Sequence, residues 1–105
     1  MKNTLENEVL TIFFEGEINS FNSEDIDREI DAIMNSNQYK EIVIDMRDLR
    51  YISSAGLRIL IKVKKECAET KLVNVPKAVY DVFGMVGFEN LFKIEKLQGS
   101  YFTKI

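Results

Sequence analysis

Hydrophobic residues recur along the chain with two different spacings, and these spacings alternate. Short runs rich in β-branched and aromatic residues, which are typical of buried strands, occupy residues 9–14, 41–45 and 71–75. The segments between them repeat apolar residues every three or four positions, as one face of a helix does. A run at 93–97 alternates polar and apolar residues and predicts an edge strand. This alternation predicts an α/β fold with a small, mostly parallel sheet, flanked by about three to four helices and joined by right-handed crossovers.

Each predicted helix has an apolar stripe that should face the sheet. The first helix follows a turn at residues 19–23, and its stripe is Ile26, Ile30, Ile33 and Met34. In the second helix, expected over residues 57–68, the buried residues should be Leu57, Leu60 and Ile61, with either Val63 or the stem of Lys64, and with Cys67 and Ala68 on the last turn. The third helix begins at Pro76 and ends at Gly87, and its stripe is Val79, Val82, Phe83 and Val86.

The remaining segments are expected to be connections or ends. Residues 1–7 are polar and predict a frayed end or an edge strand. Residues 15–18 should end or bend the first strand, and residues 46–52 should form a loop that leads to the second helix. The residues after Gln98 contain aromatic side chains and either pack back or stay loose.

Length and composition limit the possible classes of protein. With 105 residues and 46% hydrophobic content, the chain should form one domain, residues 1–105, with its own core. A net charge of −3 gives no basic footprint for nucleic acid. We expect no membrane insertion, because no apolar run reaches membrane length. The single cysteine, Cys67, rules out an internal disulfide and fits a reducing, cytoplasmic location.

The usual chemistry of catalysis is missing from the sequence. There is no histidine and no glycine-rich phosphate loop, so we predict no catalytic and no cofactor-binding residues, and no cofactor. The acidic residues between positions 24 and 31 match the offsets of no metal-binding loop and are expected to form a solvated helix face. We predict a protein that is not an enzyme and binds no metal.

Two adjacent serines stand where the second strand gives way to the second helix. Ser53 and Ser54 are followed by the small residues Ala55 and Gly56, which leave the turn uncovered. Unpaired backbone N–H groups gather at a helix N-terminus, and an anion there is stabilised by about 0.3–1 kcal/mol. Serine is also a preferred N-cap. From this spacing alone, capping, anion binding and phosphorylation all remain open.

Several segments together resemble a known family. Residues 42–57, with the sequence IVIDMRDLRYISSAGL, resemble the signature of the STAS family, the bacterial anti-sigma factor antagonists. The segment FEGEI at 14–18 is similar to the family's second strand, and residues 72–76 and 87–92 are similar to its C-terminal half. The resemblance covers residues 8–95, nearly the whole chain.

This resemblance implies a function as a phosphorylation switch. Members of the family bind an anti-sigma factor that is also a serine kinase, and their unphosphorylated form captures it and frees a sigma factor. The kinase then phosphorylates the antagonist, and a PP2C-type phosphatase reverses the modification. The family's phosphoacceptor lies two residues before the glycine, which here is Ser54, with Ser53 as the weaker candidate.

The expected docking face surrounds the acceptor, and the resemblance adds the loop before the first helix. The predicted partner-binding residues are Ser20, Phe21, Asn22, Ser23, Arg50, Tyr51, Ser53, Ala55, Gly56 and Arg58. Two residues depart from the family pattern: Ser53 stands where aspartate is common, and Arg58 stands where small residues are common. Both departures bear on which kinase is the partner.

Two other functions are weighed against this one. The first keeps the fold but makes the chain a non-switching adaptor in a lipid-transport or other signalling complex, with Ser54 only capping the helix. The second is a small enzyme, which the missing catalytic chemistry disfavours.

Overall fold

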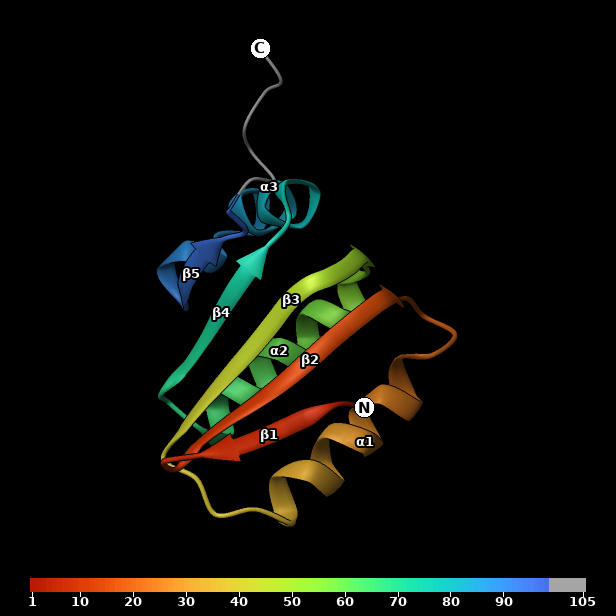
Figure 1. Cartoon of the computed structure of the whole chain (residues 1–105). Coiled ribbons are helices and arrows are strands. Elements are labelled where there is room, and N and C mark those ends of the chain that lie inside the picture. The colour runs from red at the N-terminus through yellow and green to blue at the C-terminus, as the bar shows by residue number, and fades with distance from the viewer. Residues whose placement is uncertain (99–105) are drawn as a thin grey trace.

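Five strands form one sheet in the order β1-β2-β3-β4-β5 in the computed structural model, which describes residues 1–98 (Figure 1). The strands are β1 (Asn3–Glu6), β2 (Val9–Ile18), β3 (Glu41–Ile52), β4 (Thr70–Val75) and β5 (Lys93–Lys96). The helices are α1 (Ser23–Asn35), α2 (Ser54–Glu66) and α3 (Lys77–Val86), followed by a 3-10 turn at Phe88–Asn90. β2 to β5 are parallel, and β1 is an antiparallel edge strand, which confirms the predicted α/β fold. The predictions for Tyr101 and its neighbours lie outside the described residues.

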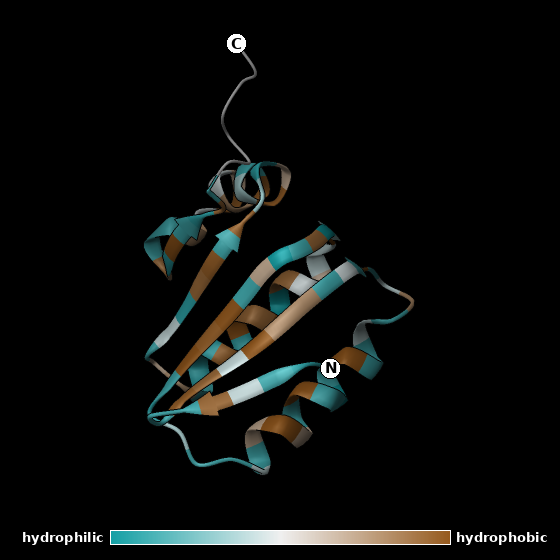
Figure 2. Ribbon diagram, viewed as in Figure 1, coloured by the Kyte–Doolittle hydropathy of each residue, from teal (hydrophilic) through white to brown (hydrophobic). Residues whose placement is uncertain are grey.

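The apolar stripes of the strands and helices meet in one core. Figure 2 shows brown, hydrophobic segments along the central strands and on the helix faces. α2 lies behind β2 and β3 in Figure 1 and also contacts α1. The buried side chains of β2 are Leu10, Ile12 and Phe14, and those of α1 are Ile30 and Met34. Cys67 is also buried, directly after α2, and belongs to this core.

The second helix is partly rotated relative to our prediction, which was right for Leu60, Val63 and Cys67 and wrong for Ala68, which is exposed. Its buried residues are Gly56, Ile59, Leu60 and Val63. Leu60 is fully buried as expected, but Leu57 and Ile61 are only half-buried and flank this stripe. A stripe spaced by three, one and three residues is as helical as the predicted one, so periodicity alone could not choose between them.

The third helix is shorter on its apolar side than predicted. Val79 and Phe83 are buried, but Val86 is 49% exposed. Gly87 ends the helix with a φ of 77°, as expected, so the chain turns away after Val86. Phe88 then takes the next core position and stacks on Phe83 with ring centroids 5.2 Å apart. Val86 is therefore left at the surface.

The expected loop at residues 46–52 is wrong, because β3 continues to Ile52. Pairing with β4 covers only residues 42–45, while pairing with β2 extends to the end of both strands. Two register shifts each place one extra β3 residue opposite β2, first between Asp45 and Asp48 and then between Leu49 and Tyr51. Each bulge lengthens the usual step of two between buried residues to three, which hid the strand pattern.

The first strand is also longer than expected. Residues 15–18 bend β2 and do not end it, because Gly16 adopts a φ of 70° within the strand. Glycine tolerates this left-handed conformation, which other residues rarely adopt. The result is that β2 and β3 finish side by side, with Ile18 opposite Ile52.

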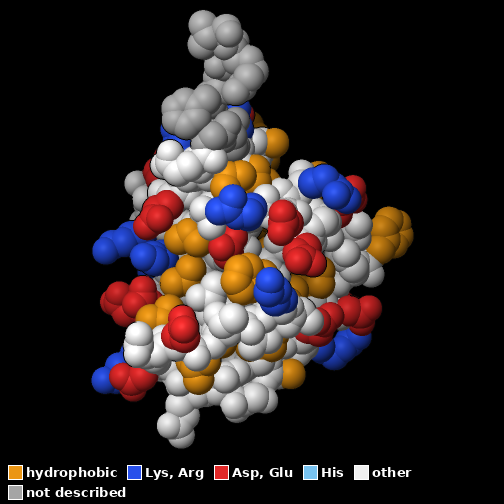
Figure 3. Space-filling view, in the orientation of Figure 1, with side chains coloured by type: hydrophobic (Ala, Val, Ile, Leu, Met, Phe, Trp, Pro, Cys, Tyr) orange, Lys and Arg blue, Asp and Glu red, His pale blue; other side chains and the backbone are white. Residues whose placement is uncertain are grey.

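Two surface features bear on what the molecule can contact. Figure 3 shows acidic and basic side chains interspersed over the face that it presents, with hydrophobic side chains between them. This face therefore offers no extended region of one charge. Among the described residues, no helix combines the length and the apolar character needed to cross a membrane.

Candidate functional site

The two adjacent serines have different surroundings. Ser53 is the N-cap of α2: its Oγ accepts a hydrogen bond from the Gly56 backbone N–H at 3.3 Å. Its own N–H donates to the carbonyl of Ile18 at 2.8 Å, which fixes it to the end of β2. Ser54 is the first residue of α2 and is exposed, and its hydroxyl makes no hydrogen bond within residues 1–98. Capping therefore belongs to Ser53, and the reading in which Ser54 only caps the helix is wrong.

Gly56 allows the start of α2 to approach the strand ends closely. A Cβ atom at this position would lie 2.6 Å from Cγ1 of Ile52 and 2.9 Å from Cγ2 of Ile18. Contacts this short do not occur between carbon atoms at rest, so a side chain here would push the helix outward. Gly56 is itself buried, so its role in this structure is to position the helix N-terminus.

The loop between β2 and α1 is held by its own asparagines. Oδ1 of Asn19 accepts from the backbone N–H groups of Phe21 and Asn22, at 2.9 and 3.1 Å. The Asn22 side chain accepts from the Asn19 N–H and donates to the Glu17 carbonyl, both at 2.9 Å. Asn22 occupies the N-cap position of α1, but these bonds turn its side chain back into the loop, so it does not cap the helix.

This loop presents an aromatic side chain to solvent. Phe21 is 95% exposed, the largest exposed fraction among the big apolar side chains of the described residues. Ser20 beside it is also exposed, while Ser23 is half-buried as the first residue of α1. On the neighbouring strand, Tyr51 is 51% exposed. Aromatic side chains held in this way make large contact areas when a protein docks on them.

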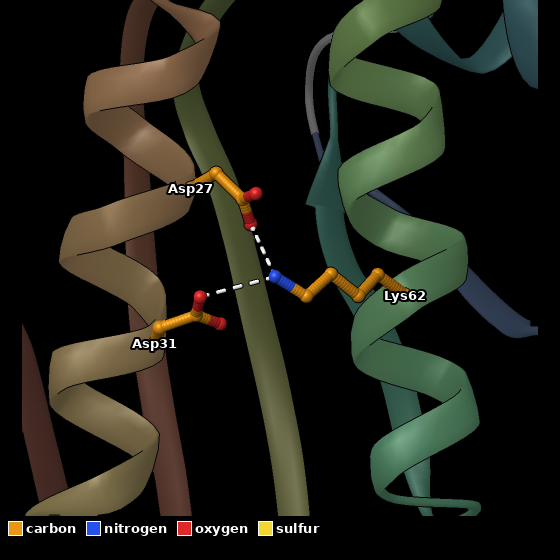
Figure 4. Close-up of polar contacts among 3 residues, drawn as sticks. All are labelled: Asp27, Asp31 and Lys62. Atoms are coloured by element: carbon orange, nitrogen blue, oxygen red, sulfur yellow. Dashed lines mark hydrogen bonds and ion pairs between the residues drawn. The ribbon is translucent and has the colours of Figure 1, made fainter.

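A groove of about 260 Å³ runs between the first turns of α1 and α2. Its walls are Ser23, Glu24 and Asp27 on one side and Ala55, Arg58, Ile59 and Lys62 on the other. Figure 4 shows Lys62 reaching from α2 to two carboxylates of α1. Its Nζ lies 3.1 Å from Oδ1 of Asp27 and 3.0 Å from Oδ2 of Asp31. The hydrogen bonds to Asp31 and then to Asp27 raise the pKa of Lys62, so it stays protonated and ties the helices together.

The structure brings the predicted site residues together at one edge of the sheet. The loop residues 20–23 follow β2, and the α2 residues 53–58 follow β3, whose end pairs with that of β2. Arg58 is exposed and Ala55 half-buried beside the groove. Arg50 and Tyr51 are also exposed, but they line a separate pocket with Ala78, Val79 and Val82 of α3. Whether these residues bind a partner stays a prediction.

Sequence reasoning missed two parts of the site. It did not find the asparagine bonds that hold the loop, although the spacing Asn19–Asn22 could have suggested side-chain bonds to nearby backbone N–H groups. It also missed Lys62, because its partners lie 31 and 35 positions away in the sequence. Among the described residues, no cluster of histidine, cysteine or acidic side chains is arranged to hold a metal ion.

Comparison with known proteins decides the family. The STAS domain family's sequence model matches residues 2–99, nearly the whole chain. The chain belongs to the STAS domain family. BtrV of Bordetella bronchiseptica, named as an anti-sigma factor antagonist, is 31% identical to this STAS chain over 90 residues, which cover 82% of the chain and 77% of BtrV.

Solved structures show the same STAS fold. A Thermotoga maritima protein, also named as an anti-sigma factor antagonist, superposes with a TM-score of 0.81 at 18% identity, covering 90% of this chain and 85% of its own. The anti-sigma factor antagonist SpoIIAA in its unphosphorylated form gives a TM-score of 0.69 at 21% identity, with 89% and 87% covered. SpoIIAA of Bacillus has also been solved in a phosphorylated form, and that structure gives a TM-score of 0.62 at 20% identity, with 89% and 90% covered.

Proposed function

We propose that this STAS chain is an anti-sigma factor antagonist that is switched by phosphorylation of Ser54. Unphosphorylated, it captures an anti-sigma factor that is also a serine kinase, and a sigma factor is released. The kinase then phosphorylates Ser54 and ends the interaction, and a PP2C-type phosphatase restores it. In this role the chain is a binding module in the cytoplasm and catalyses no reaction itself.

One observation carries this proposal: only one of the two adjacent serines is used to cap the helix, and the other stays exposed. Ser53 caps α2 through its hydroxyl, and its backbone N–H is bonded to the Ile18 carbonyl at the end of β2. Ser54 is exposed and keeps its hydroxyl free of hydrogen bonds within residues 1–98. A kinase can therefore reach the Ser54 hydroxyl without breaking the helix cap. The phosphorylated form solved for SpoIIAA supports modification in a protein of this fold.

The fold should tolerate a phosphate at this position. Phosphorylation adds about −1.5 to −2 charges at neutral pH. Ser54 is the first residue of α2, where the helix dipole and the unpaired N–H groups favour an anion. The modification therefore has little effect on folding, and its main effect is on whatever docks over the helix N-terminus.

The docking surface that we propose combines exposed aromatic anchors with the acceptor serine. Phe21 projects from the loop that follows β2, Tyr51 lies near the end of β3 beside β2, and Ser54 lies at the start of the helix that follows β3. Interface energy is concentrated in a few residues, most often aromatic ones and arginine. We expect Phe21 to be the main anchor and Arg50 and Arg58 to set the orientation of the partner.

A labelling experiment tests the switch. The purified chain is incubated with ATP and each candidate anti-sigma kinase of the same organism, and phosphate uptake is located by mass spectrometry. We expect one phosphate on Ser54 in the wild type and in Ser53→Ala, and none in Ser54→Ala. Uptake by Ser54→Ala but not by Ser53→Ala would move the acceptor to Ser53. No labelling of the wild type would reject the switch and favour the non-switching adaptor.

A further inference from the structure

Ser54, Arg58 and Lys62 follow one another at intervals of four residues along α2. Residues at this spacing lie on the same side of a helix, with about 5–6 Å between neighbouring Cβ atoms. Ser54 and Arg58 are both exposed, and Arg58 also lines the groove between α1 and α2. The guanidinium of Arg58 is therefore within reach of any group attached to the Ser54 oxygen.

The two cations of this row differ in their partners. Lys62 is held by Asp27 and Asp31 at 3.1 and 3.0 Å. Arg58 makes no ion pair within residues 1–98. Two acids, Glu24 and Asp27, share the groove lining with Arg58; neither pairs with it, and Asp27 is bonded to Lys62. Arg58 is thus an uncommitted cation one turn away from the proposed acceptor.

We propose, on the basis of the proposed phosphorylation, that Arg58 binds the phosphate on Ser54 within the same molecule. A guanidinium presents parallel N–H donors that match two phosphate oxygens, and such charge-assisted pairs are among the stronger hydrogen bonds. The phosphate is then drawn along α2 toward the groove. Phosphorylation then changes the docking face in two ways. It adds an anion, and it occupies Arg58, the cation of this row that a partner could otherwise bind.

The proposal makes Arg58 a regulatory residue. In the unmodified protein Arg58 faces solvent and is available to an acidic group on the partner. In the modified protein the same side chain is occupied by the phosphate. The helix N-terminus also favours the anion, but that effect is the same whether position 58 is arginine or glutamine, so the two contributions can be separated.

The test measures the phosphate itself and needs neither kinase nor partner. Phosphoserine is incorporated at position 54 during translation, and its second ionisation is followed by phosphorus NMR as a function of pH. A nearby cation favours the doubly charged phosphate and lowers its pKa. Arg58→Gln should therefore raise this pKa by about 0.3 unit or more, the size expected for an exposed pair at this spacing. Arg58→Lys should give an intermediate value.

Lys65→Gln is the matched control. Lys65 is an exposed cation on the same helix. It lies 11 positions beyond Ser54, about 16 Å along the helix axis, which exceeds the screening length of about 8–10 Å in ordinary buffer. This substitution should leave the phosphate pKa unchanged. Equal pKa values in the parent, Arg58→Gln and Lys65→Gln proteins would overturn the proposal. Because the phosphate is installed directly, this result is distinguishable from a failure of any kinase to label Ser54.

Discussion

The segments at the two ends of the central strands are held by different kinds of hydrogen bond. At the amino end of β3, separate segments bond to one another: the Lys40 N–H donates to the Glu8 carbonyl at 2.8 Å, and Ile42 N–H donates to the Glu69 carbonyl at 2.9 Å. Within the connection from α2 to β4, the buried Thr70 hydroxyl also donates to the Cys67 carbonyl at 2.6 Å. At the carboxyl end, by contrast, the loop after β2 bonds mostly to itself and leaves Phe21 in solvent.

We interpret this difference as a division between contacts that stabilise the fold and contacts that position side chains for a partner. Hydrogen bonds that join distant segments resist unfolding, because breaking them exposes several parts of the chain at once. Hydrogen bonds within one short loop instead hold a few side chains in a fixed position, which reduces the entropy lost when a partner binds. We therefore expect changes to the exposed side chains of the carboxyl end to alter binding, and changes to buried contacts at either end to alter stability.

The largest effect is expected from Ser54→Asp, which places a charge at the carboxyl end. An unpaired charge buried at an interface costs roughly 2–5 kcal/mol, or about 30- to 5000-fold in affinity. Binding to the cognate anti-sigma kinase with ADP, measured by calorimetry, should weaken by that factor, while the thermal midpoint of the chain stays the same. Ser54→Ala should bind like the wild type. Wild-type affinity in Ser54→Asp would remove Ser54 from the interface.

Phe21→Ala should weaken the same complex by about 2 kcal/mol, or roughly 30-fold, if Phe21 is an interface anchor. Because its side chain is 95% exposed, the free energy of unfolding should not change. Met85→Ala is the matched control, since Met85 is 79% exposed on α3, outside the proposed surface. A loss of affinity that is the same for both variants would argue against an anchor at Phe21.

Gly56→Ala tests whether the carboxyl end depends on close packing. The added methyl group would overlap Ile52 and Ile18, and overpacking of this kind costs about 1–3 kcal/mol. Gly84→Ala in α3 meets no atom within 4 Å and should be neutral or stabilising by up to about 1 kcal/mol, because alanine favours a helix. Urea unfolding of both variants measures the difference. If both are equally stable, α2 can move away from the strands without cost.

The smallest expected effect is at the amino end, from Thr70→Val. The substitution removes the hydrogen bond to the Cys67 carbonyl and should reduce the free energy of unfolding by about 1 kcal/mol. Binding to the anti-sigma kinase should be unchanged. An affinity loss in this variant without a loss of stability would show that the two ends do not divide these roles.

The sequence predicted the order of elements and that the serine pair lies between a strand and a helix, because both depend on local patterns. Alternating spacings marked the strands and helices, and small residues between a strand and a helix marked the serine pair. The sequence did not decide which serine caps α2. That choice depends on where β3 ends relative to β2, since the Ser53 N–H bonds to Ile18, which is remote in the sequence.

The other differences also arise from tertiary contacts. Residues 46–52 resemble a loop because their buried members, Met46, Leu49 and Ile52, are spaced by three. A lone strand does not show this spacing, and it follows from pairing with β2 through two bulges. In the same way, Lys62 gave no local signal, because its role is defined by carboxylates on another helix.

The two bulges of β3 determine which position at the start of α2 each later residue occupies. β2 spans the shared stretch with 10 residues and β3 with 12. If one residue were deleted between Asp45 and Asp48 and α2 kept its place, each later residue would move back by one position. Ser54 would then occupy the capping position and Ala55 the exposed one. We expect such a variant to take up no phosphate from the kinase although both serines are still present, which would make the proposed switch depend on the length of a strand as well as on the serine itself.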